Sequence, residues 1–300
     1  MLRAFIARFI QEFLADPEKN NLGPGTTDQA WDGFVLGFSN GADPLYDFLK
    51  EHIGEFHWSP AEAFTLGWPA AQTAAAEAHD AAGGPSAAGP GNPRPDELTV
   101  VSWALCQTEA TKKANRAQTR FPSEPWARSR IYGQKCGRSL QRALVKALAS
   151  EGYAAVAPAL LPEWTETESP TYGRASTWSE RHVAYVSGLG TFSLCGGLIT
   201  ERGQAARFGS LVVHAAIPST ARSYSDPFAY CLFYHDRSCT ACVDRCPVGS
   251  VTPGGRDKKA CAQHLESATA DYVKHEYGFD GYGCGLCQTG VPCESGIPVP

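Results

Sequence analysis

The sequence lacks several features that would assign it to a class at once. It has no uninterrupted run of about eighteen apolar residues, the length that a membrane-spanning helix needs, so we expect no membrane span. Charged residues make up only 19% and the formal net charge is −5, which argues against a general nucleic-acid binder. Arg8, Gln11 and Glu12 interrupt the apolar start, and no twin arginine follows, so no export signal is indicated. These absences predict a cytoplasmic protein in a reducing compartment.

The chain also lacks a strict alternation of strands and helices, which predicts an α+β fold rather than a doubly wound sheet. Apolar spacing predicts helices over residues 1–15 and 139–148. A capping box at Thr177–Glu180 predicts the opening of a short helix that runs to Ser187. β-branched and apolar runs predict strands over residues 98–105, 153–157 and 209–215. The expected domains are a helical region (1–73), a flexible Ala/Gly/Pro-rich insertion (74–97), a body of mixed strands and helices (98–227), to which the resemblance described below assigns cofactor binding, and a cysteine-rich domain (228–300).

Cysteine is abundant near the C-terminal end, where eight of the eleven cysteines lie within seventy residues. Cys239-x2-Cys242-x3-Cys246-Pro247 is nearly the run of bacterial ferredoxins, in which the cysteine before proline binds the other of two clusters. Structural zinc would use Cys-x2-Cys pairs but does not explain the Cys-Pro step or the total of eight. A disulfide framework suits small secreted domains. The pattern therefore predicts two [4Fe–4S] clusters.

One position departs from the ferredoxin run, because Asp236 lies where a cysteine three residues before Cys239 would be expected. The missing ligand is then either Cys231 or the Asp236 carboxylate, and the softer thiolate is favoured for iron–sulfur iron. The predicted ligand sets are Cys231, Cys239, Cys242 and Cys293 for one cluster, and Cys246, Cys261, Cys284 and Cys287 for the other.

The residues before the cysteines carry a family resemblance. The segment 178–192, with Glu180-Arg181 and Gly188-Leu-Gly190, is followed by residues 197–200 and 209–213 and then by the cysteine region. This order resembles epoxyqueuosine reductase and the catalytic core of respiratory reductive dehalogenases over roughly residues 98–293. The resemblance implies a nitroreductase-like domain that holds base-off cobalamin, followed by a bacterial-ferredoxin-like two-cluster domain. It also implies a low-potential electron donor, a ferredoxin or a flavodoxin.

The same resemblance suggests which residues contact the corrinoid. They are Trp178, Gly188, Leu189, Gly190 and Ser193. The two glycines would allow positive φ and close approach of backbone to a large planar ligand. The alternative is a helix C-cap followed by a tight turn, which requires no ligand.

The expected catalytic position differs from the family pattern. In epoxyqueuosine reductases a catalytic aspartate lies six residues before the glutamate of the Glu-Arg pair, and here that position is Arg174. Arginine cannot supply a proton as a carboxylic acid does. Tyr172 beside Arg174 resembles instead the tyrosine with basic neighbours of reductive dehalogenases. The alternatives are a packed tyrosine and an arginine paired with a carboxylate such as Glu180.

Two classes of function follow from these features. The first is a cobalamin-dependent iron–sulfur reductase acting on a small-molecule or nucleoside substrate. The alternative is an electron-transfer or corrinoid-reducing protein without substrate chemistry of its own, and a third interpretation places a flavin in the nitroreductase-like domain. Among the other cysteines, Cys106 and Cys136 are expected to be buried and inert, and Cys195 lies nearest to the expected cofactor pocket.

Overall fold

The fold is built around one antiparallel sheet. The computed structural model of the chain describes residues 1–69 and 93–299. The sheet has the strand order β1-β2-β8-β3, and each strand is antiparallel to its neighbours. Its strands are β1 (Trp31–Asn40), β2 (Leu98–Gln107), β8 (Ala206–His214) and β3 (Ala155–Val156). Every residue of β2 is buried because helices cover both faces of the sheet.

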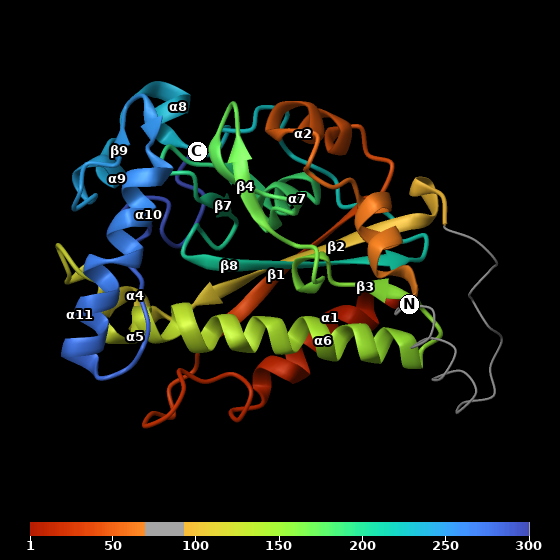
Figure 1. The fold of residues 1–300 in the computed structure, drawn as a ribbon, viewed down its shortest axis with the longest axis horizontal. Coiled ribbons are helices and arrows are strands. Elements are labelled where there is room, and N and C mark those ends of the chain that lie inside the picture. The colour runs from red at the N-terminus through yellow and green to blue at the C-terminus, as the bar shows by residue number, and fades with distance from the viewer. Residues whose placement is uncertain (70–92, 300) are drawn as a thin grey trace.

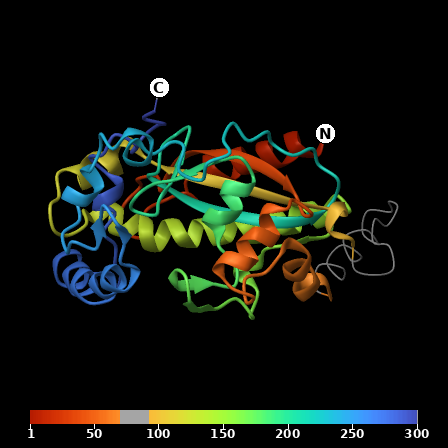
Figure 2. The same ribbon diagram turned by 90° about the horizontal axis from the view of Figure 1, so that it is seen from above.

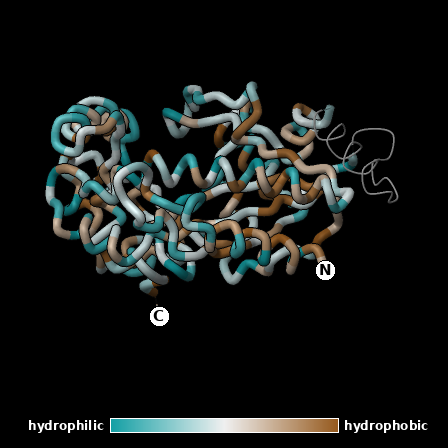
Figure 3. The backbone as a smooth tube through the Cα atoms, turned by 90° about the horizontal axis from the view of Figure 1, so that it is seen from below, coloured by the Kyte–Doolittle hydropathy of each residue, from teal (hydrophilic) through white to brown (hydrophobic). Residues whose placement is uncertain are grey.

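Each face of the sheet packs against its own helices (Figures 1 and 2). On one face lie α1 (Leu2–Ala15) and α6 (Gln134–Ser150), and on the other lie α2 (Leu45–Ile53), a helical stretch over residues 60–69, and α7 (Glu180–Val186). Alternate side chains of β2 point to opposite faces of the sheet, because successive residues of a strand alternate in direction. Trp103 packs toward α6 and Ala104 toward α7. Hydrophobic residues accordingly run through the middle of the molecule (Figure 3).

Shorter elements connect these layers. The segment from 124 to 150 is helical throughout, with a π-helical turn between α5 and α6. The connecting elements are η1 (Pro95–Glu97), α4 (Glu109–Arg116), α5 (Glu124–Arg128), η2 (Ser129–Gly133), η3 (Pro158–Leu160), the hairpin β4 (Glu166–Ser169) and β5 (Gly173–Ser176), and the pair β6 (Gly190–Phe192) and β7 (Leu198–Thr200).

The cysteine-rich part lies at one end of the sheet, beside α4 and α5 (Figure 1). Its elements are α8 (Leu232–Asp236), α9 (Ala241–Asp244), β9 (Val251–Thr252), β10 (Gly255–Arg256), α10 (Lys258–Glu266), α11 (Ala268–Tyr277) and η4 (Leu286–Gln288). Buried Asn115 of α4 donates to the Cys284 carbonyl (3.1 Å) and to Thr289 Oγ1 (3.0 Å). Arg245 donates to the carbonyls of Gln118 (3.1 Å) and Thr289 (2.9 Å). These bonds fix the cysteine-bearing loops to the body.

The predicted mixture of helices and strands is confirmed, and helices and strands form at each of the segments predicted for them, with shifted ends. The interpretation of residues 1–73 as helical is wrong, because β1 forms the edge of the main sheet and pairs with β2. The predicted capping box is also wrong: Ser179 is the N-cap of α7, and the Glu180 side chain turns into the interior. Of the expected insertion, residues 74–92 lie outside the described part of the chain. Within residues 1–69 and 93–299, no helix combines the length and apolar character needed to cross a membrane.

Candidate iron–sulfur and cofactor site

Four C-terminal cysteines line one small pocket. They are Cys231, Cys239, Cys242 and Cys293, which we call the first set. Cys231 is the N-cap of α8 and Cys242 lies on α9, so two short helices and the C-terminal loop bring the thiols together. Apolar side chains, among them Leu194, Phe233 and Val291, complete the lining. A group held here would be shielded from water.

Two thiols of the first set, Cys242 and Cys293, ionise unfavourably without a cation. Burial raises the pKa of Cys293, and the neighbouring Cys195 and Cys231 raise it further. A hydrogen bond with Cys195, followed by burial, raises the pKa of Cys242. Metal ligation requires the thiolate, so bound iron would offset the cost of ionising these buried sulfurs. The chemistry of the first set therefore fits an iron–sulfur cluster.

The second set consists of Cys246, Cys261, Cys284 and Cys287. They lie at the end of α9, on α10, before η4 and within η4. Burial raises the pKa of Cys284 to about 11, and the charges of Cys261 and Cys246 contribute, so these three thiols lie within electrostatic reach of one another. Cys246 differs, because hydrogen bonds from Ser250 and from backbone N–H groups outweigh burial, its largest single influence, and lower its pKa.

Arg256 of β10 lies against the second set. Its Nη2 donates to Cys261 Sγ (2.8 Å), and its Nη1 donates to the Cys195 carbonyl (3.3 Å). The buried Nε has no hydrogen-bond partner among the described residues. Burial lowers the pKa of Arg256, but Cys261 and Cys287 more than compensate and raise it. This cation fits beside a cluster whose thiolates carry net negative charge.

The geometry also bears on the choice between Cys231 and Asp236. Asp236 is exposed, and its Oδ1 accepts the Ser238 backbone N–H (2.9 Å) in a local turn. It is not among the residues that line the first-set pocket, whereas buried Cys231 is. The placement favours Cys231 as the fourth ligand.

The cysteines are unpaired and do not converge on one point. All eleven are free thiols. Within the described ranges, no three His, Cys, Asp or Glu side chains come close enough together to hold a single metal ion. A [4Fe–4S] cluster takes one thiolate at each iron, so its ligands surround a body of several atoms.

Three polar residues, Ser193, Cys195 and Gln204, lie between the two sets. The sequence did not predict that they form a group. Cys195 is only 1% exposed and lies within hydrogen-bonding reach of Cys242 of the first set and Cys287 of the second. Gln204 Nε2 donates to Cys293 Sγ (3.1 Å) and to the Cys287 carbonyl (3.2 Å). Ser193, expected to contact the corrinoid, instead donates to Gln204 Oε1 (2.8 Å). No sequence pattern marks Gln204, because its position depends on how the C-terminal loop docks.

A group of arginines lies next to the second set. Arg181 of α7 and Arg207 of β8 are partly buried, and within the described part of the chain neither forms a hydrogen bond or an ion pair. Burial lowers the pKa of both, and Arg130 lowers each further. Arg130, on the π-helical turn, donates to Tyr282 Oη (2.6 Å). The region therefore offers guanidinium donors that no carboxylate neutralises.

Glu180 precedes Arg181 but points the other way. Its carboxylate accepts from Ser210 Oγ (2.6 Å) and from Gln141 Nε2 (3.1 Å). Burial raises its pKa to about 7, against the lowering effect of those hydrogen bonds. Helix α7 thus presents an acid to the interior between α6 and β8, and this acid is the partner of neither Arg174 nor Arg181.

The residues expected to contact a corrinoid have internal roles. Gly188 (φ 81°) follows α7, where the Gly188 and Leu189 N–H groups donate to the Tyr185 and Ala184 carbonyls, which is a Schellman cap. A Cβ at Gly190 would collide with the Ile199 carbonyl across the β6–β7 pair. Trp178 is 1% exposed and donates to Ser210 Oγ (3.0 Å), and Leu189 is also buried. The two glycines are therefore already required by contacts within the chain, and their contact with a corrinoid stays a prediction.

The expected catalytic pair lies on an exposed hairpin. Tyr172 is 45% exposed at the β4–β5 turn, and Lys258 Nζ lies 5.7 Å from the centre of its ring. Arg174 forms ion pairs with Glu166 and with Glu266 (2.6 Å). Its charge is therefore already neutralised at the surface. This setting does not support catalysis by Tyr172 and Arg174, and the suggested pairing of Arg174 with Glu180 is wrong.

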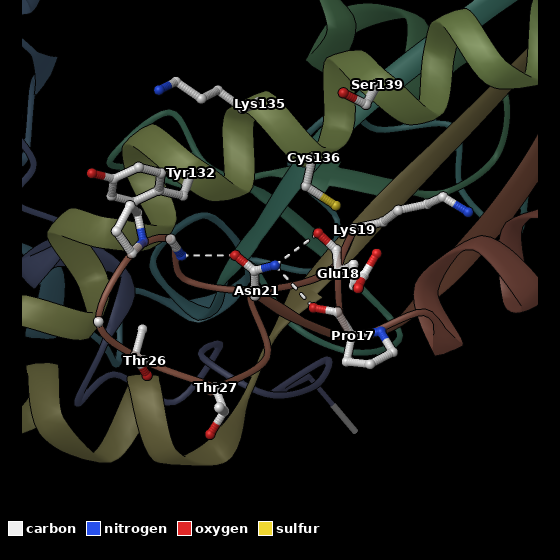
Figure 4. A pocket seen from close by; sticks show the side chains of 13 residues that line it. Pro17, Glu18, Lys19, Asn21, Thr26, Thr27, Tyr132, Lys135, Cys136 and Ser139 are labelled. Atoms are coloured by element: carbon white, nitrogen blue, oxygen red, sulfur yellow. Dashed lines mark hydrogen bonds between the residues drawn. The ribbon is translucent and has the colours of Figure 1, made fainter.

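An open hollow of about 760 Å³ lies on the α1–α6 side of the sheet (Figure 4). Asn21 shapes its wall by donating to the Pro17 and Glu18 carbonyls and accepting the Gly23 N–H, and Tyr132 and Lys135 line another side. Its volume would suit a small ligand. However, no cysteine of either set and no predicted site residue lines it, so we do not assign the cofactor to it.

Comparison with known proteins finds epoxyqueuosine reductases that are similar to parts of this chain. No family model matches the chain. The epoxyqueuosine reductase of Bacillus anthracis is 40% identical over 65 residues, which is 20% of this chain and 17% of that protein. That of Bacillus cereus is 29% identical over 125 residues, 40% of this chain and 30% of that protein. The chain thus matches less than a third of the length of these relatives. The predicted resemblance to epoxyqueuosine reductases is confirmed.

Comparison with solved structures gives matches of low sequence identity. An epoxyqueuosine reductase from Streptococcus thermophilus matches 97% of this chain and 66% of its own at 15% identity, with a TM-score of 0.44. Another was solved with an epoxyqueuosine-modified tRNA stem loop, at 17% identity and a TM-score of 0.44, and matches 96% of this chain and 66% of its own. A catabolic reductive dehalogenase matches 70% of this chain and 27% of its own at 14% identity, with a TM-score of 0.40.

Proposed function

We propose that this chain is a cobalamin-dependent iron–sulfur reductase. Two [4Fe–4S] clusters would carry single electrons from a low-potential ferredoxin or flavodoxin to a corrinoid that reduces a small-molecule or nucleoside-like substrate. The observation that carries the proposal is the pocket lined by four of the eight C-terminal cysteines, with Arg256 donating to Cys261 among the other four. The resemblance to epoxyqueuosine reductases supports the choice of a corrinoid as the electron acceptor.

The first set would hold the cluster nearer to the electron donor. Its thiols come from α8, α9 and the C-terminal loop, which are held to the body through Asn115 and Arg245. The apolar lining would exclude water, which favours a low reduction potential because the added charge is poorly solvated. Because α8 and α9 lie on the side away from the main sheet (Figure 1), a partner protein would approach the first set there.

The second set would hold the cluster nearer to the cofactor. Arg256 donates to Cys261 there, so this chain supplies a fixed cation beside the cluster sulfurs. Such a charge stabilises the reduced form relative to the oxidised form and sets the two clusters at different potentials. The different surroundings of the two sets would therefore favour electron flow from the first set to the second.

The arginine region fits the corrinoid or its substrate. Arg181 and Arg207 are partly buried donors that have no partner among residues 1–69 and 93–299, and the phosphate and amide side chains of a corrinoid are hydrogen-bond acceptors. The bound corrinoid would supply the reductive bond-breaking chemistry, while the protein binds and orients it. We assign no catalytic role to Tyr172 or Arg174, and the glycines at 188 and 190 are explained by packing within the chain.

The proposal is tested by removing one ligand from each set. The protein and its Cys242→Ala and Cys284→Ala variants are reconstituted anaerobically with iron and sulfide, and Mössbauer and EPR spectra are recorded. Each variant should lose or convert one cluster and keep the other, so that two distinct spectra add up to that of the parent. Cys136→Ala is the matched control, because Cys136 is a buried thiol on α6 that packs in a different hydrophobic cluster from the C-terminal cysteines. Loss of both signals in either variant, or loss in the control, would contradict two independent sets.

A further inference from the structure

A hydrogen-bonded group of three side chains connects the two cysteine sets. The Cys195 thiol lies within hydrogen-bonding reach of Cys242 in the first set and of Cys287 in the second. Gln204 Oε1 accepts from Ser193 Oγ (2.8 Å) and from Cys195 Sγ (3.5 Å). Because its oxygen is engaged there, the Gln204 amide directs its N–H groups at Cys293 Sγ (3.1 Å) and the Cys287 carbonyl (3.2 Å).

The backbone has space for this group only because of two glycines. A Cβ at Gly197 would collide with Gln204 Oε1, and a Cβ at Gly203 (φ 82°) would collide with the Glu294 carbonyl. The contact at Gly203 lets the Gln204 N–H donate to the Cys293 carbonyl (2.9 Å), which joins the β7–β8 connection to the C-terminal loop. The group is therefore positioned by backbone bonds on both sides, and all three side chains are at most 4% exposed.

We propose that Cys195 and Gln204 are positioning residues that bridge the two iron–sulfur clusters, setting their potentials and coupling them. This inference rests on the proposed function, since it needs a cluster on each set. Cys195 is a ninth cysteine in excess of the eight ligands that two clusters require. Its sulfur lies between one ligand of each set. An electron that leaves one cluster and enters the other therefore passes Cys195, and no bond is formed or broken.

Hydrogen bonds to cluster sulfurs are one of the influences that set cluster potentials. A donor placed at a ligand thiolate stabilises the extra electron, so its removal makes reduction harder. Cys195 has one thiol proton, which it donates to Gln204 Oε1 (3.5 Å) or to the Cys287 carbonyl (3.6 Å), and Gln204 donates an amide proton to Cys293 Sγ (3.1 Å). Loss of the Cys195 thiol frees the amide that binds Cys293 of the first set and removes a donor beside Cys287 of the second. It should therefore lower the potentials of both clusters, whereas loss of the Gln204 amide should act mainly on the first.

The test is an EPR-monitored redox titration of the reconstituted chain and three variants. Cys195→Ala removes the thiol, Cys195→Ser keeps a hydroxyl donor in its place, and Gln204→Leu removes the amide without changing a cysteine. Iron is counted in every sample, and Cys136→Ala serves as the control for removal of a buried thiol. We expect each variant to keep the iron of the parent. Cys195→Ala should shift both midpoint potentials downward and weaken the magnetic interaction between the reduced clusters, and Cys195→Ser should restore much of both.

The outcomes separate this inference from the proposed function. If the parent chain forms two clusters and neither Cys195→Ala nor Gln204→Leu shifts a potential or the interaction, the bridge is refuted while the two clusters remain. If Cys195→Ala loses the iron of one cluster, Cys195 is a ligand and the assignment of a bridge is wrong. If the parent chain itself forms fewer than two clusters, the proposed function fails first and the bridge fails with it.

Discussion

Replacing Glu180 with glutamine should stabilise the protein at alkaline pH. The Glu180 carboxylate is held inside the fold by Ser210 (2.6 Å) and Gln141 (3.1 Å), and burial raises its pKa to about 7. At higher pH the folded protein must hold a negative charge in that position, with two neutral partners and, within the described part of the chain, no cation paired with it. A glutamine side chain can keep an acceptor and a donor in the same place and never ionises.

The size of the effect follows from the shift of the pKa. The rise from 4.5 to about 7 corresponds to about 2.5 pKa units, or about 3 kcal/mol. Because the folded-state pKa is the higher one, the folded state binds the proton more tightly than the unfolded state. The corresponding stability is complete below pH 4.5 and is lost as the pH rises through about 7. Glu180→Gln should not lose this stability at high pH, because glutamine does not ionise.

The assay is anaerobic urea unfolding of the two cluster-loaded proteins at about pH 5.5 and about pH 8.5. The difference in free energy of unfolding between Glu180→Gln and the parent should grow from about 1 kcal/mol at the lower pH to about 3 kcal/mol at the higher. Glu201→Gln is the control, because Glu201 is exposed and its change should stay within about 0.5 kcal/mol. A difference that does not grow with pH, or a variant less stable than the parent at about pH 8.5, would refute the reasoning.

Three other predictions concern the ligands, the glycine turn and the arginines. Cys231→Ala should remove about four irons per chain and Asp236→Ala none, by iron analysis, and the reverse result would transfer ligation to the carboxylate. Gly190→Ala should lower the free energy of unfolding by about 1–3 kcal/mol, because its Cβ would collide with the Ile199 carbonyl, and an unchanged value would argue against that contact. Arg207→Gln should weaken corrinoid binding about tenfold in a titration of the cluster-loaded protein while leaving the iron content unchanged, and unaltered binding would place the corrinoid elsewhere.

Much of the cysteine arrangement could be anticipated because ligand spacing is local. The Cys239–Cys246 run has a spacing shared with ferredoxins, and the grouping of Cys293 with the first three residues of the first set follows from that pattern. The structure places those four thiols around one pocket. Whether each set holds a cluster stays a prediction that the metal measurements test.

The elements that could not be anticipated depend on long-range contacts. Strand β1 contains Gly33 and Gly37 and lacks a clear two-residue alternation, so only its pairing with β2 reveals it. The glycines at 188 and 190 have the same sequence signature whether they face a ligand or serve a helix cap and a close contact within the chain. Only the folded chain shows the cap at Gly188 and the Ile199 carbonyl beside Gly190. Gln204 lies 89 residues from Cys293, a separation at which no local pattern could indicate the contact.

The central claim is tested most directly by measuring iron and cobalt in one sample. The chain is reconstituted anaerobically with iron and sulfide, incubated with cobalamin, freed of unbound cofactor and analysed for both metals and for its optical spectrum. The account predicts about eight iron atoms and about one cobalt atom per chain, with the spectrum of a base-off corrinoid. A chain that holds about four irons with zinc in the remaining sites, or that retains no cobalt at full iron content, would contradict it.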